Sequence, residues 1–451
     1  MQYQIDRQRE YFDTGATRPI QFRLDRLKAL AANINFREQE LLEALSQDLG
    51  KPASEAYSSE IGYVLRDIDH ALRNLRRWMR PRRVRAPAAA WPGSARVVFE
   101  PLGTVLILAP WNYPLQLALS PLIAAVAAGN CVVLKPSELA PNTAAAIERV
   151  CAAAFETEHV SVLQGDGGLA AELTAMPFNH IFFTGSTRIG RLVAQAAAAN
   201  LVPSTLELGG KSPCIVREDA RLDLAARRIM WGKTMNAGQT CVAPDYLLVH
   251  DDIFDDFVAR LAAVAEEFSA DNYGSIVSGD HYERLCRMLD ECEIYAGGQR
   301  DAKALKIKPA IILNPDPQSA VMQEEIFGPI MPVVAYSDFG AELACLRTAP
   351  APLAAYLFTE NRARIRDFIE SVRTGSICVN DTVMQLFPAD LPFGGVGRSG
   401  WGRYHGRAGF ETFSNCKSVM TRSTCIDIKV RYPTSHATLA QLKRVYKWFM
   451  R

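Results

Sequence analysis

The chain has 451 residues, and its 50 Lys and Arg nearly balance its 49 Asp and Glu, which leaves a net charge of +1. That length allows roughly two to three folding units with large buried cores. The hydrophobic fraction of 49% excludes a disordered or fibrous chain, since such chains bury too little apolar surface. The balanced charge also gives no electrostatic basis for nucleic acid as a partner.

Ten cysteines are scattered along the chain, and no two of them form a C-x-x-C pair. Zinc ribbons and dithiol redox pairs need that spacing, so we expect no metal site. We expect the cysteines to be small buried side chains in a reducing compartment. The first residues lack the apolar core of a secretory signal, and no segment reaches the roughly 20 apolar residues of a membrane span. The expected location is the cytoplasm.

Helices are expected across residues 20–80, where leucines recur at helical spacing. A proline-rich stretch follows over residues 81–103 and ends in an alternating run, which is typical of a hairpin or a connecting arm. A cluster of arginines lies beside it, between Arg73 and Arg85. Such a cluster favours a solvated helix end or a subunit contact over a phosphate or membrane-surface role.

From residue 104 the pattern changes to short apolar strands that alternate with helices. The first strands are expected at 104–109, 131–136, 160–165 and 180–185, with helices over 142–155 and 188–199. A second set begins near residue 209, with strands expected at 214–217, 246–250, 354–360 and 375–380. Strands that are buried on both faces and alternate with helices predict an α/β fold with a doubly wound parallel sheet.

Several loops that follow these strands suit a nucleotide. GDGGLA, residues 165–170, fits G-x-G-x-x-A, but the acidic residue expected about 20 positions later is missing, so the ordinary dinucleotide fingerprint fails. Gly185 and Ser186 precede a helix N-terminus, where free N–H groups favour a phosphate. Lys135 and Glu138 follow another strand, where a ribose could hydrogen-bond. Tight turns that need a positive φ are the structural alternative.

Two further residues have the chemistry of a nucleophile and a base. Cys241 lies in the loop GQTCVAP, and a thiol there attacks a carbonyl once its proton is removed. Glu207 ends an apolar strand before two glycines, where burial favours a raised pKa and a role as general base. Taken alone, the cysteine is better explained as a buried structural thiol than as a nucleophile.

In their order and spacing, these segments resemble the aldehyde dehydrogenase superfamily, most closely its class 3 members. The resemblance covers essentially the whole chain and is carried by PWNYPLQLALSPLIAAVAAGN, KPSE, FFTGSTRIG, LELGGKSP, GQTCVAPDY, QEEIFGP and LPFGGVGRSGWGRYHG. It implies NAD(P)-dependent oxidation of an apolar aliphatic or aromatic aldehyde to the carboxylic acid. It also implies a Rossmann-like parallel-sheet cofactor domain, an α/β catalytic domain and a small bridging element.

The resemblance gives roles to the reacting residues. Cys241 would form a thiohemiacetal and then a thioester, and Glu207 would activate the hydrolytic water. The side chain of Asn112 and the backbone N–H of Cys241 would form the oxyanion hole. Tyr113 and three further residues would line an apolar substrate tunnel, although each fits simple core packing as well. These three are Leu117, Met235 and Thr240.

The resemblance also implies how the cofactor is held. Lys135 and Glu138 would contact the adenosine ribose, and the turn at Gly185 and Ser186 would lie beside the pyrophosphate. Glu325 and Phe327 of the EEIFGP segment would hold and back the nicotinamide ribose. Because Glu138 would repel a 2′-phosphate, we expect NAD as cofactor, with NADP as an alternative.

For the domains, the resemblance implies an NAD(P)-binding part over residues 1–80 and 104–208 and a catalytic part over 209–380. Residues 81–103 and 412–430 would form the bridging element of a homodimer, and 431–451 a tail helix. In that tail one helical face is apolar, with Leu439, Leu442, Tyr446, Phe449 and Met450. Packing on a partner subunit is the simpler expectation for it, and gating of the tunnel or peripheral membrane contact are the alternatives.

Two other functions fit parts of the sequence. A CoA-acylating aldehyde dehydrogenase shares the fold and the cysteine, but commonly lacks the general-base glutamate, so Glu207 argues against it. A non-catalytic structural relative need not keep the nucleophile, base, oxyanion and ribose residues together, whereas this chain has all of them.

Overall fold

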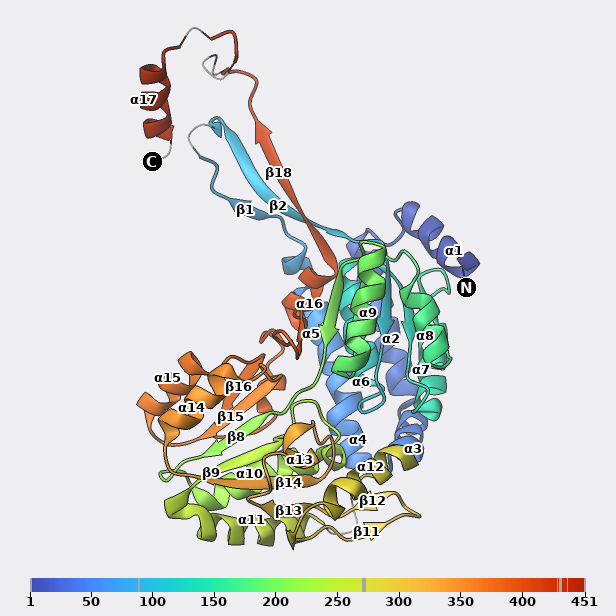
Figure 1. Cartoon of the computed structure of the whole chain (residues 1–451). Helices are drawn as coiled ribbons and strands as arrows, with labels where there is room; N and C mark the ends of the chain where they lie inside the picture. The colour runs from blue at the N-terminus through green and yellow to red at the C-terminus, as the bar shows by residue number, and fades with distance from the viewer. Residues whose placement is uncertain are drawn as a thin grey trace.

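The computed structural model describes residues 2–87, 90–269, 273–427, 429, 432–435 and 437–449. Two α/β units form the body, and a long arm of strands projects from it (Figure 1). Helices occupy the N-terminal region, as the leucine spacing predicts. They are α1 (Gln2–Asp13), α2 (Ile20–Phe36), α3 (Glu38–Leu49), α4 (Ala53–Ala56), the π-helical turn η1 (Tyr57–Ile61) and α5 (Gly62–Trp78).

The first sheet has the strand order β17-β7-β6-β3-β4-β5. Its five parallel strands are β3 (Thr104–Leu108), β4 (Cys131–Lys135), β5 (Val160–Val162), β6 (His180–Thr184) and β7 (Ser204–Glu207). The connecting helices are α6 (Gln116–Ala128), α7 (Pro141–Ala154), α8 (Gly167–Thr174) and α9 (Thr187–Ala199). The predicted parallel sheet is confirmed. It also gains an antiparallel edge strand, β17 (Gly400–Trp401), from far along the chain.

The second sheet has the order β10-β13-β14-β9-β8-β15-β16, and it is parallel except for β10. The four strands expected there are present as β8 (Pro213–Val216), β9 (Tyr246–His250), β15 (Ala354–Phe358) and β16 (Ser376–Val379). The sequence missed β10 (Ile294–Ala296), β13 (Ala310–Leu313) and β14 (Ile330–Tyr336). Pro332 inside β14 conceals that strand, because proline normally argues against a central strand.

Helices and short turns surround the second sheet. They are α10 (Leu222–Thr234), η3 (Met235–Gly238), η4 (Asp251–Ile253), α11 (Phe254–Phe268), α12 (Gly279–Asp290), α13 (Ala320–Gln323), α14 (Phe339–Thr348), α15 (Arg362–Ser371) and η5 (Met384–Leu386). A two-stranded ribbon, β11 (Arg300–Asp301) and β12 (Lys306–Ile307), lies at the end of the body where α12 runs. The chain then returns to the first unit through β17 and α16 (Gly406–Thr412).

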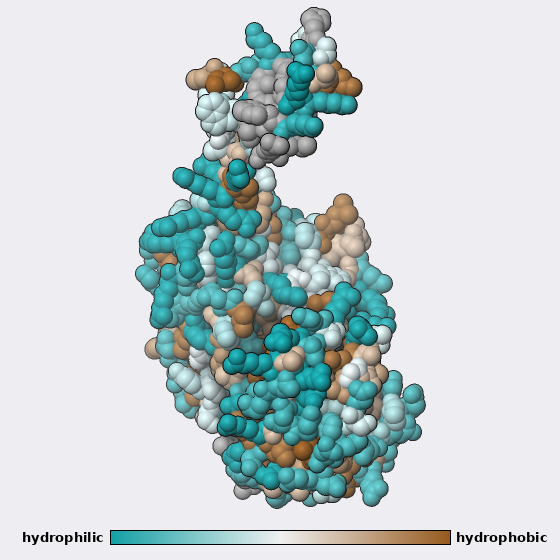
Figure 2. All heavy atoms as spheres, turned by 90° about the vertical axis from the view of Figure 1, so that its left-hand side faces the viewer, coloured by the Kyte–Doolittle hydropathy of each residue, from teal (hydrophilic) through white to brown (hydrophobic). Residues whose placement is uncertain are grey.

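The arm is a three-stranded antiparallel sheet of β1 (Arg82–Val84), β2 (Gly93–Pro101) and β18 (Ser414–Arg422). This confirms a hairpin in the proline-rich stretch. The arm and the helix beyond it, α17 (Leu439–Phe449), stand clear of the body in the turned view (Figure 2). Leu439 and Tyr446 of α17 are 68% and 64% exposed. Met450 and the side chain of Phe449 lie outside the part that the structure describes.

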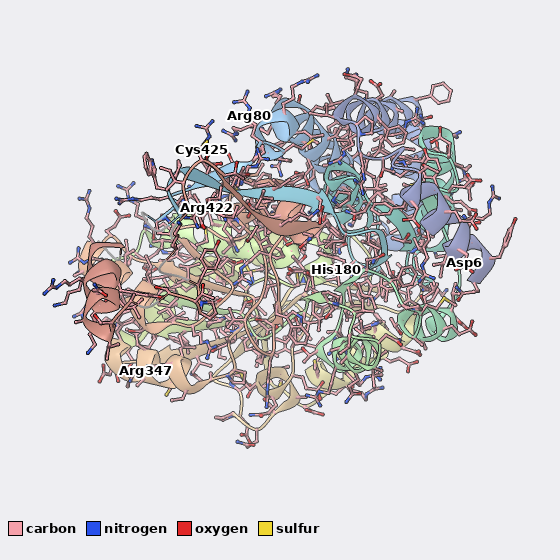
Figure 3. All side chains as sticks on the ribbon, turned by 90° about the horizontal axis from the view of Figure 1, so that it is seen from above. Asp6, Arg80, His180, Arg347, Arg422 and Cys425 are labelled. Carbon is pink, nitrogen blue, oxygen red and sulfur yellow. The ribbon has the colours of Figure 1, made fainter. Side chains whose placement is uncertain are left out.

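The cysteines are less uniform than the sequence suggests. Cys131, Cys151 and Cys214 are buried as expected. The expectation is wrong for Cys345, Cys416 and Cys425, which are exposed, because they lie on α14, on the arm and on the segment after the arm. Figure 3 shows Cys425 beside the arm, close to the labelled Arg422. Across the described ranges, no helix is both long and apolar enough to cross a membrane.

Candidate active site

The three residues expected to react come together between the two α/β units. Glu207 ends β7, and Asn112 follows β3, so both lie at the carboxyl edge of the first sheet, where ligands of open α/β sheets bind. Cys241 comes from the second unit, in the loop between η3 and β9. The amide Nδ2 of Asn112 donates a hydrogen bond to the carbonyl of Gln239, 3.0 Å away, and this contact joins the two loops.

The Cys241 thiol lies in an environment that keeps it protonated. Burial, followed by the charges of Glu325 and Glu207, raises the pKa of this thiol to about 12. The backbone N–H groups of Cys241 and Val242 act in the opposite direction. Because the thiolate is the nucleophile, this cysteine needs a neighbouring base to remove its proton.

Glu207 has the properties of such a base. Its side chain is buried, and neither carboxyl oxygen accepts a hydrogen bond from any residue that the structure describes. Burial raises the pKa of Glu207 well above its ordinary value, and the charge of Arg403 opposes that shift. A buried carboxyl without a partner binds a proton more readily than a solvated one, so Glu207 is suited to take one from a thiol or a water.

The backbone before Cys241 is unusual. Asn236, Ala237 and Gly238 follow one another with φ values of 51°, 55° and 76°, a left-handed conformation that is costly for the first two. Hydrogen bonds hold this turn, since Gln239 Nε2 donates to the carbonyl of Ser275 at 2.9 Å. At Gly238 a β-carbon would lie 2.3 Å from a neighbouring carbonyl oxygen. The turn thereby fixes where the cysteine points.

The expected adenosine contacts lie at the same sheet edge. Lys135 Nζ donates to Glu138 Oε2 at 2.7 Å, and the lysine is buried while the carboxylate reaches the surface. Ser186 caps α9, where its hydroxyl accepts from the N–H of Ile189 at 3.4 Å. The N–H of Gly185 donates to the carbonyl of Glu207 at 3.0 Å, so one backbone hydrogen bond links the turn expected to bind phosphate with the residue expected to act as the base.

The expected nicotinamide contacts lie on the second unit. A β-carbon at Gly209 would lie 2.1 Å from Glu325 Oε2, so the glycine makes room for that carboxyl. Burial and the charge of Asp245 raise the pKa of Glu325 to about 8. Phe327 has a φ of 51°, and its ring meets the ring of Trp111 edge-on, with centroids 5.3 Å apart. A half-buried carboxyl beside an aromatic wall fits a ribose diol, whose hydroxyls donate to it.

The four residues expected in the substrate tunnel line one cavity with Cys241, and they are Tyr113, Leu117, Met235 and Thr240. The empty space at this cavity, including its opening to solvent, is about 550 Å³. The hydroxyls of Tyr113 and Thr240 lie 2.7 Å apart. Among the described residues, no three His, Cys, Asp or Glu side chains gather as metal ligands would.

Sequence reasoning missed most of the remaining lining. The residues concerned are Ser59, Tyr63, Gln116, Val242, Val383, Leu386, Phe387, Phe393, Tyr404 and His405. Phe393, Tyr404 and His405 belong to the glycine-rich segment that the resemblance included, although no role followed from it. Tyr63 had no signal at all, because it reads as one more apolar position of an N-terminal helix.

Comparison with known proteins agrees with this geometry. The aldehyde dehydrogenase family model matches residues 1–419. A Staphylococcus aureus protein named 4,4'-diaponeurosporen-aldehyde dehydrogenase is 43% identical over 445 residues, which cover 97% of each chain. The dimeric NADP-preferring aldehyde dehydrogenase of Canis lupus familiaris is 39% identical over 445 residues, or 97% of this chain and 98% of its own.

Among solved structures, the substrate-bound state of Staphylococcus aureus AldH superimposes with a TM-score of 0.96 at 41% identity and covers 99% of both chains. A match that extends over the whole body and the arm leaves little of the chain outside the shared fold. The chain belongs to the aldehyde dehydrogenase family.

Proposed function

We propose that this enzyme oxidises an apolar aliphatic or aromatic aldehyde to the carboxylic acid through a thioester on Cys241 that water hydrolyses. The chain is an NAD(P)-dependent oxidoreductase by its family. The observation that carries the hydrolytic mechanism is the unpartnered, buried carboxyl of Glu207 close enough to Cys241 for its charge to raise the pKa of the thiol. A carboxyl in that position serves both proton transfers that the reaction needs.

The first step forms a bond between sulfur and carbon. Glu207 takes the thiol proton, and the Cys241 thiolate attacks the aldehyde carbonyl to give a thiohemiacetal whose oxygen carries the charge. The free N–H of the Asn112 amide and the backbone N–H of Cys241 stabilise this oxyanion. One N–H of that amide is engaged by Gln239, and an amide nitrogen has a second one.

The second step releases the acid. When bound, the nicotinamide ring accepts the hydride from the thiohemiacetal carbon. Loss of that hydride leaves a thioester on Cys241. Glu207 releases the thiol proton to solvent and then takes a proton from a water molecule, and the resulting hydroxide attacks the thioester carbonyl. The Cys241 thiolate leaves, the carboxylic acid departs, and the protons pass to solvent. Water can complete this step without CoA, which separates the proposal from a CoA-acylating enzyme.

For the cofactor, we assign Lys135 and Glu138 to the adenosine ribose, Gly185 and Ser186 to the phosphates, and Glu325 with Phe327 to the nicotinamide side. The ion pair of Lys135 and Glu138 places a carboxylate where a 2′-phosphate would lie, so NAD is the proposed preference. The closely related dog enzyme is named NADP-preferring, and NADP remains the alternative cofactor.

The domain assignment follows the sheets. The cofactor part takes residues 1–80 and 104–208, and the catalytic part takes 209–380. The arm, from 81–103 and 412–430, joins two copies into a homodimer, and the tail of 431–451 packs on the partner subunit. Deletion of residues 436–451 separates this from tunnel gating, because gating predicts a changed preference for aldehyde chain length at an unchanged subunit number.

The decisive experiment replaces the nucleophile. Cys241→Ala abolishes NADH formation with octanal or benzaldehyde, whereas the matched control Cys345→Ala, on exposed α14, retains the wild-type rate. Circular dichroism and a thermal melt check that both variants fold. Acid formation without CoA supports the hydrolytic route. Strict dependence on CoA, or NADH formation that persists in Cys241→Ala, would overturn the mechanism.

A further inference from the structure

The short segment between α3 and α5 carries three charged side chains that contact the backbone of the active-site loops. These are Lys51, Glu55 and Glu60, and Lys51 and Glu60 are completely buried. The segment includes α4 and a π-helical turn, Tyr57–Ile61. Such turns are rare and often accompany functional sites. The sequence alone predicts no functional role for any of these three side chains.

Lys51 and Glu60 form an ion pair. Their other hydrogen bonds go to the backbone of the segment that carries Asn112. Lys51 Nζ donates to the backbone carbonyl of Asn112 at 3.0 Å. Glu60 Oε2 accepts from the N–H groups of Leu115 at 2.8 Å and Gln116 at 3.2 Å. Those N–H groups begin α6, so the carboxylate also satisfies a helix N-terminus.

The backbone carbonyl of Asn112 also accepts a hydrogen bond from the turn that precedes Cys241. Asn236 Nδ2 donates to the Asn112 carbonyl at 2.7 Å and to the Gln239 carbonyl at 3.1 Å. Glu55 in turn accepts from the backbone N–H of Asn236, the first left-handed residue of the turn. One short segment therefore holds both the residue of the oxyanion hole and the turn that leads to Cys241.

A completely buried ion pair is a poor device for stability alone, because the desolvation of two charges offsets much of their attraction. A hydrophobic pair of similar volume often stabilises a fold as well or better. Such a pair does fix the geometry of the groups around it, because the ammonium and the carboxylate each tolerate only a small range of partner positions. Here the group that is held in place is the backbone carbonyl of Asn112, the residue whose side chain is proposed to stabilise the oxyanion.

We propose that Lys51 and Glu60 are a positioning pair that holds the Asn112 carbonyl, and with it the Asn112 amide, in the orientation that stabilises the thiohemiacetal oxyanion. This rests on the oxyanion role proposed above for Asn112. Neither side chain touches the substrate. Lys51 acts through the Asn112 carbonyl, and Glu60 acts through Lys51 and through the N–H groups that begin α6. Loss of the pair is therefore expected to change kcat and not cofactor binding.

The test is a double-mutant cycle on the full-length enzyme. Lys51→Met lowers kcat by about 10- to 100-fold, as misplacement of a reacting group by an ångström does, and leaves the KM for NAD unchanged. In an Asn112→Ala background, which already lacks the amide, Lys51→Met produces no further loss. Lys308→Met is the matched control, since Lys308 makes an exposed ion pair with Glu266, and it keeps the wild-type kcat.

A second arm separates positioning from stability. The double variant with Lys51→Met and Glu60→Met removes both charges and recovers the melting temperature lost in Lys51→Met. Its kcat stays low, because the Asn112 carbonyl has lost the Lys51 ammonium and keeps only the donor from Asn236 among the described residues. If Lys51→Met does not fold, Glu60→Gln carries the same cycle, since it keeps the shape and one acceptor oxygen. Recovery of kcat together with stability in the double variant would show a merely structural pair and overturn the inference.

The cycle also separates this inference from the proposed function. A wild-type kcat in Asn112→Ala would refute the oxyanion role itself. A large loss in Asn112→Ala, combined with a Lys51→Met effect that is absent or fully multiplicative with it, would refute the positioning pair and leave the oxyanion role intact.

Discussion

At the scale of single residues, a buried carboxyl, Glu207, and a half-buried one, Glu325, lie near one thiol. Burial raises the pKa of both Glu207 and Glu325, and their charges in turn raise the pKa of Cys241. Glu325 is stabilised by the backbone N–H of Gly210 and by the charge of Lys211. Glu207 has no hydrogen-bond donor among the described residues. This difference supports the proposed roles: the stabilised carboxyl is suited to bind a ribose, and the unpartnered one to accept a proton.

The raised pKa of Glu207 has a direct consequence for the pH dependence. A base works only when it is deprotonated, so kcat rises with pH through the raised pKa of Glu207, well above the ordinary value of 4.5. Glu207→Gln removes this rise and lowers kcat by about 10²- to 10⁴-fold. Rate measurements across the pH range check both effects, with the exposed Glu360→Gln as control. A pH profile in Glu207→Gln that matches the wild-type enzyme would contradict the assignment.

At the scale of elements, the sequence predicts those strands and turns that the local residue pattern determines. The strands of the first sheet and the turns after them follow from apolar runs between glycines and prolines, and Glu207, Lys135 and Ser186 lie where these runs end. The missed elements depend on distant partners. β17 has two residues and exists because Glu207 and its neighbour pair with it. Lys51 and Glu60 give no signal in the sequence, because their partners are distant: a carbonyl 61 positions away for Lys51 and N–H groups 55 and 56 positions away for Glu60.

The turn after β7 gives a prediction at this scale. A β-carbon at Gly209 would lie 2.1 Å from Glu325 Oε2, so Gly209→Ala forces the Glu325 carboxyl out of its place. We expect the KM for NAD to rise about tenfold or more, which is the loss of one hydrogen bond to a charged group. Gly279→Ala, at the start of α12, is the control because its added methyl meets no atom within 4 Å. Initial rates at varied NAD measure the effect, and an unchanged KM would show that Glu325 does not hold the cofactor.

At the scale of the whole molecule, the active site belongs to no single unit. Asn112 and Glu207 come from the first sheet, Cys241 from the second, and Tyr404 from the segment that returns to the first sheet before the arm. This arrangement explains why the sequence named the reacting residues but missed most of the tunnel. Each residue proposed to react lies at or just after a recognisable strand or in a recognisable loop, whereas the tunnel wall forms only when four distant segments meet.

The arm projects from the body, so much of its surface is left uncovered by the described part of the chain. Its strands carry apolar side chains in the open, including Val84 and Met420, and Trp91 between β1 and β2 is 66% exposed. The sheet is narrow and projects from the body (Figure 1). Exposed apolar side chains on a projecting sheet are typical of a protein interface, which is what the proposed homodimer needs.

We therefore expect the enzyme to have twice the mass of one chain in light scattering after size exclusion, and Met420→Asp to reduce that mass to one chain. A charge at this position removes an apolar contact from the proposed interface but leaves the backbone hydrogen bonds between β2 and β18 intact. Each separated copy therefore keeps its fold and its cavity. Phe36→Asp is the control, because Phe36 is 82% exposed at the end of α2 on the body. A wild-type protein that is monomeric, or a Met420→Asp variant that stays dimeric, would show that the arm does not join two copies.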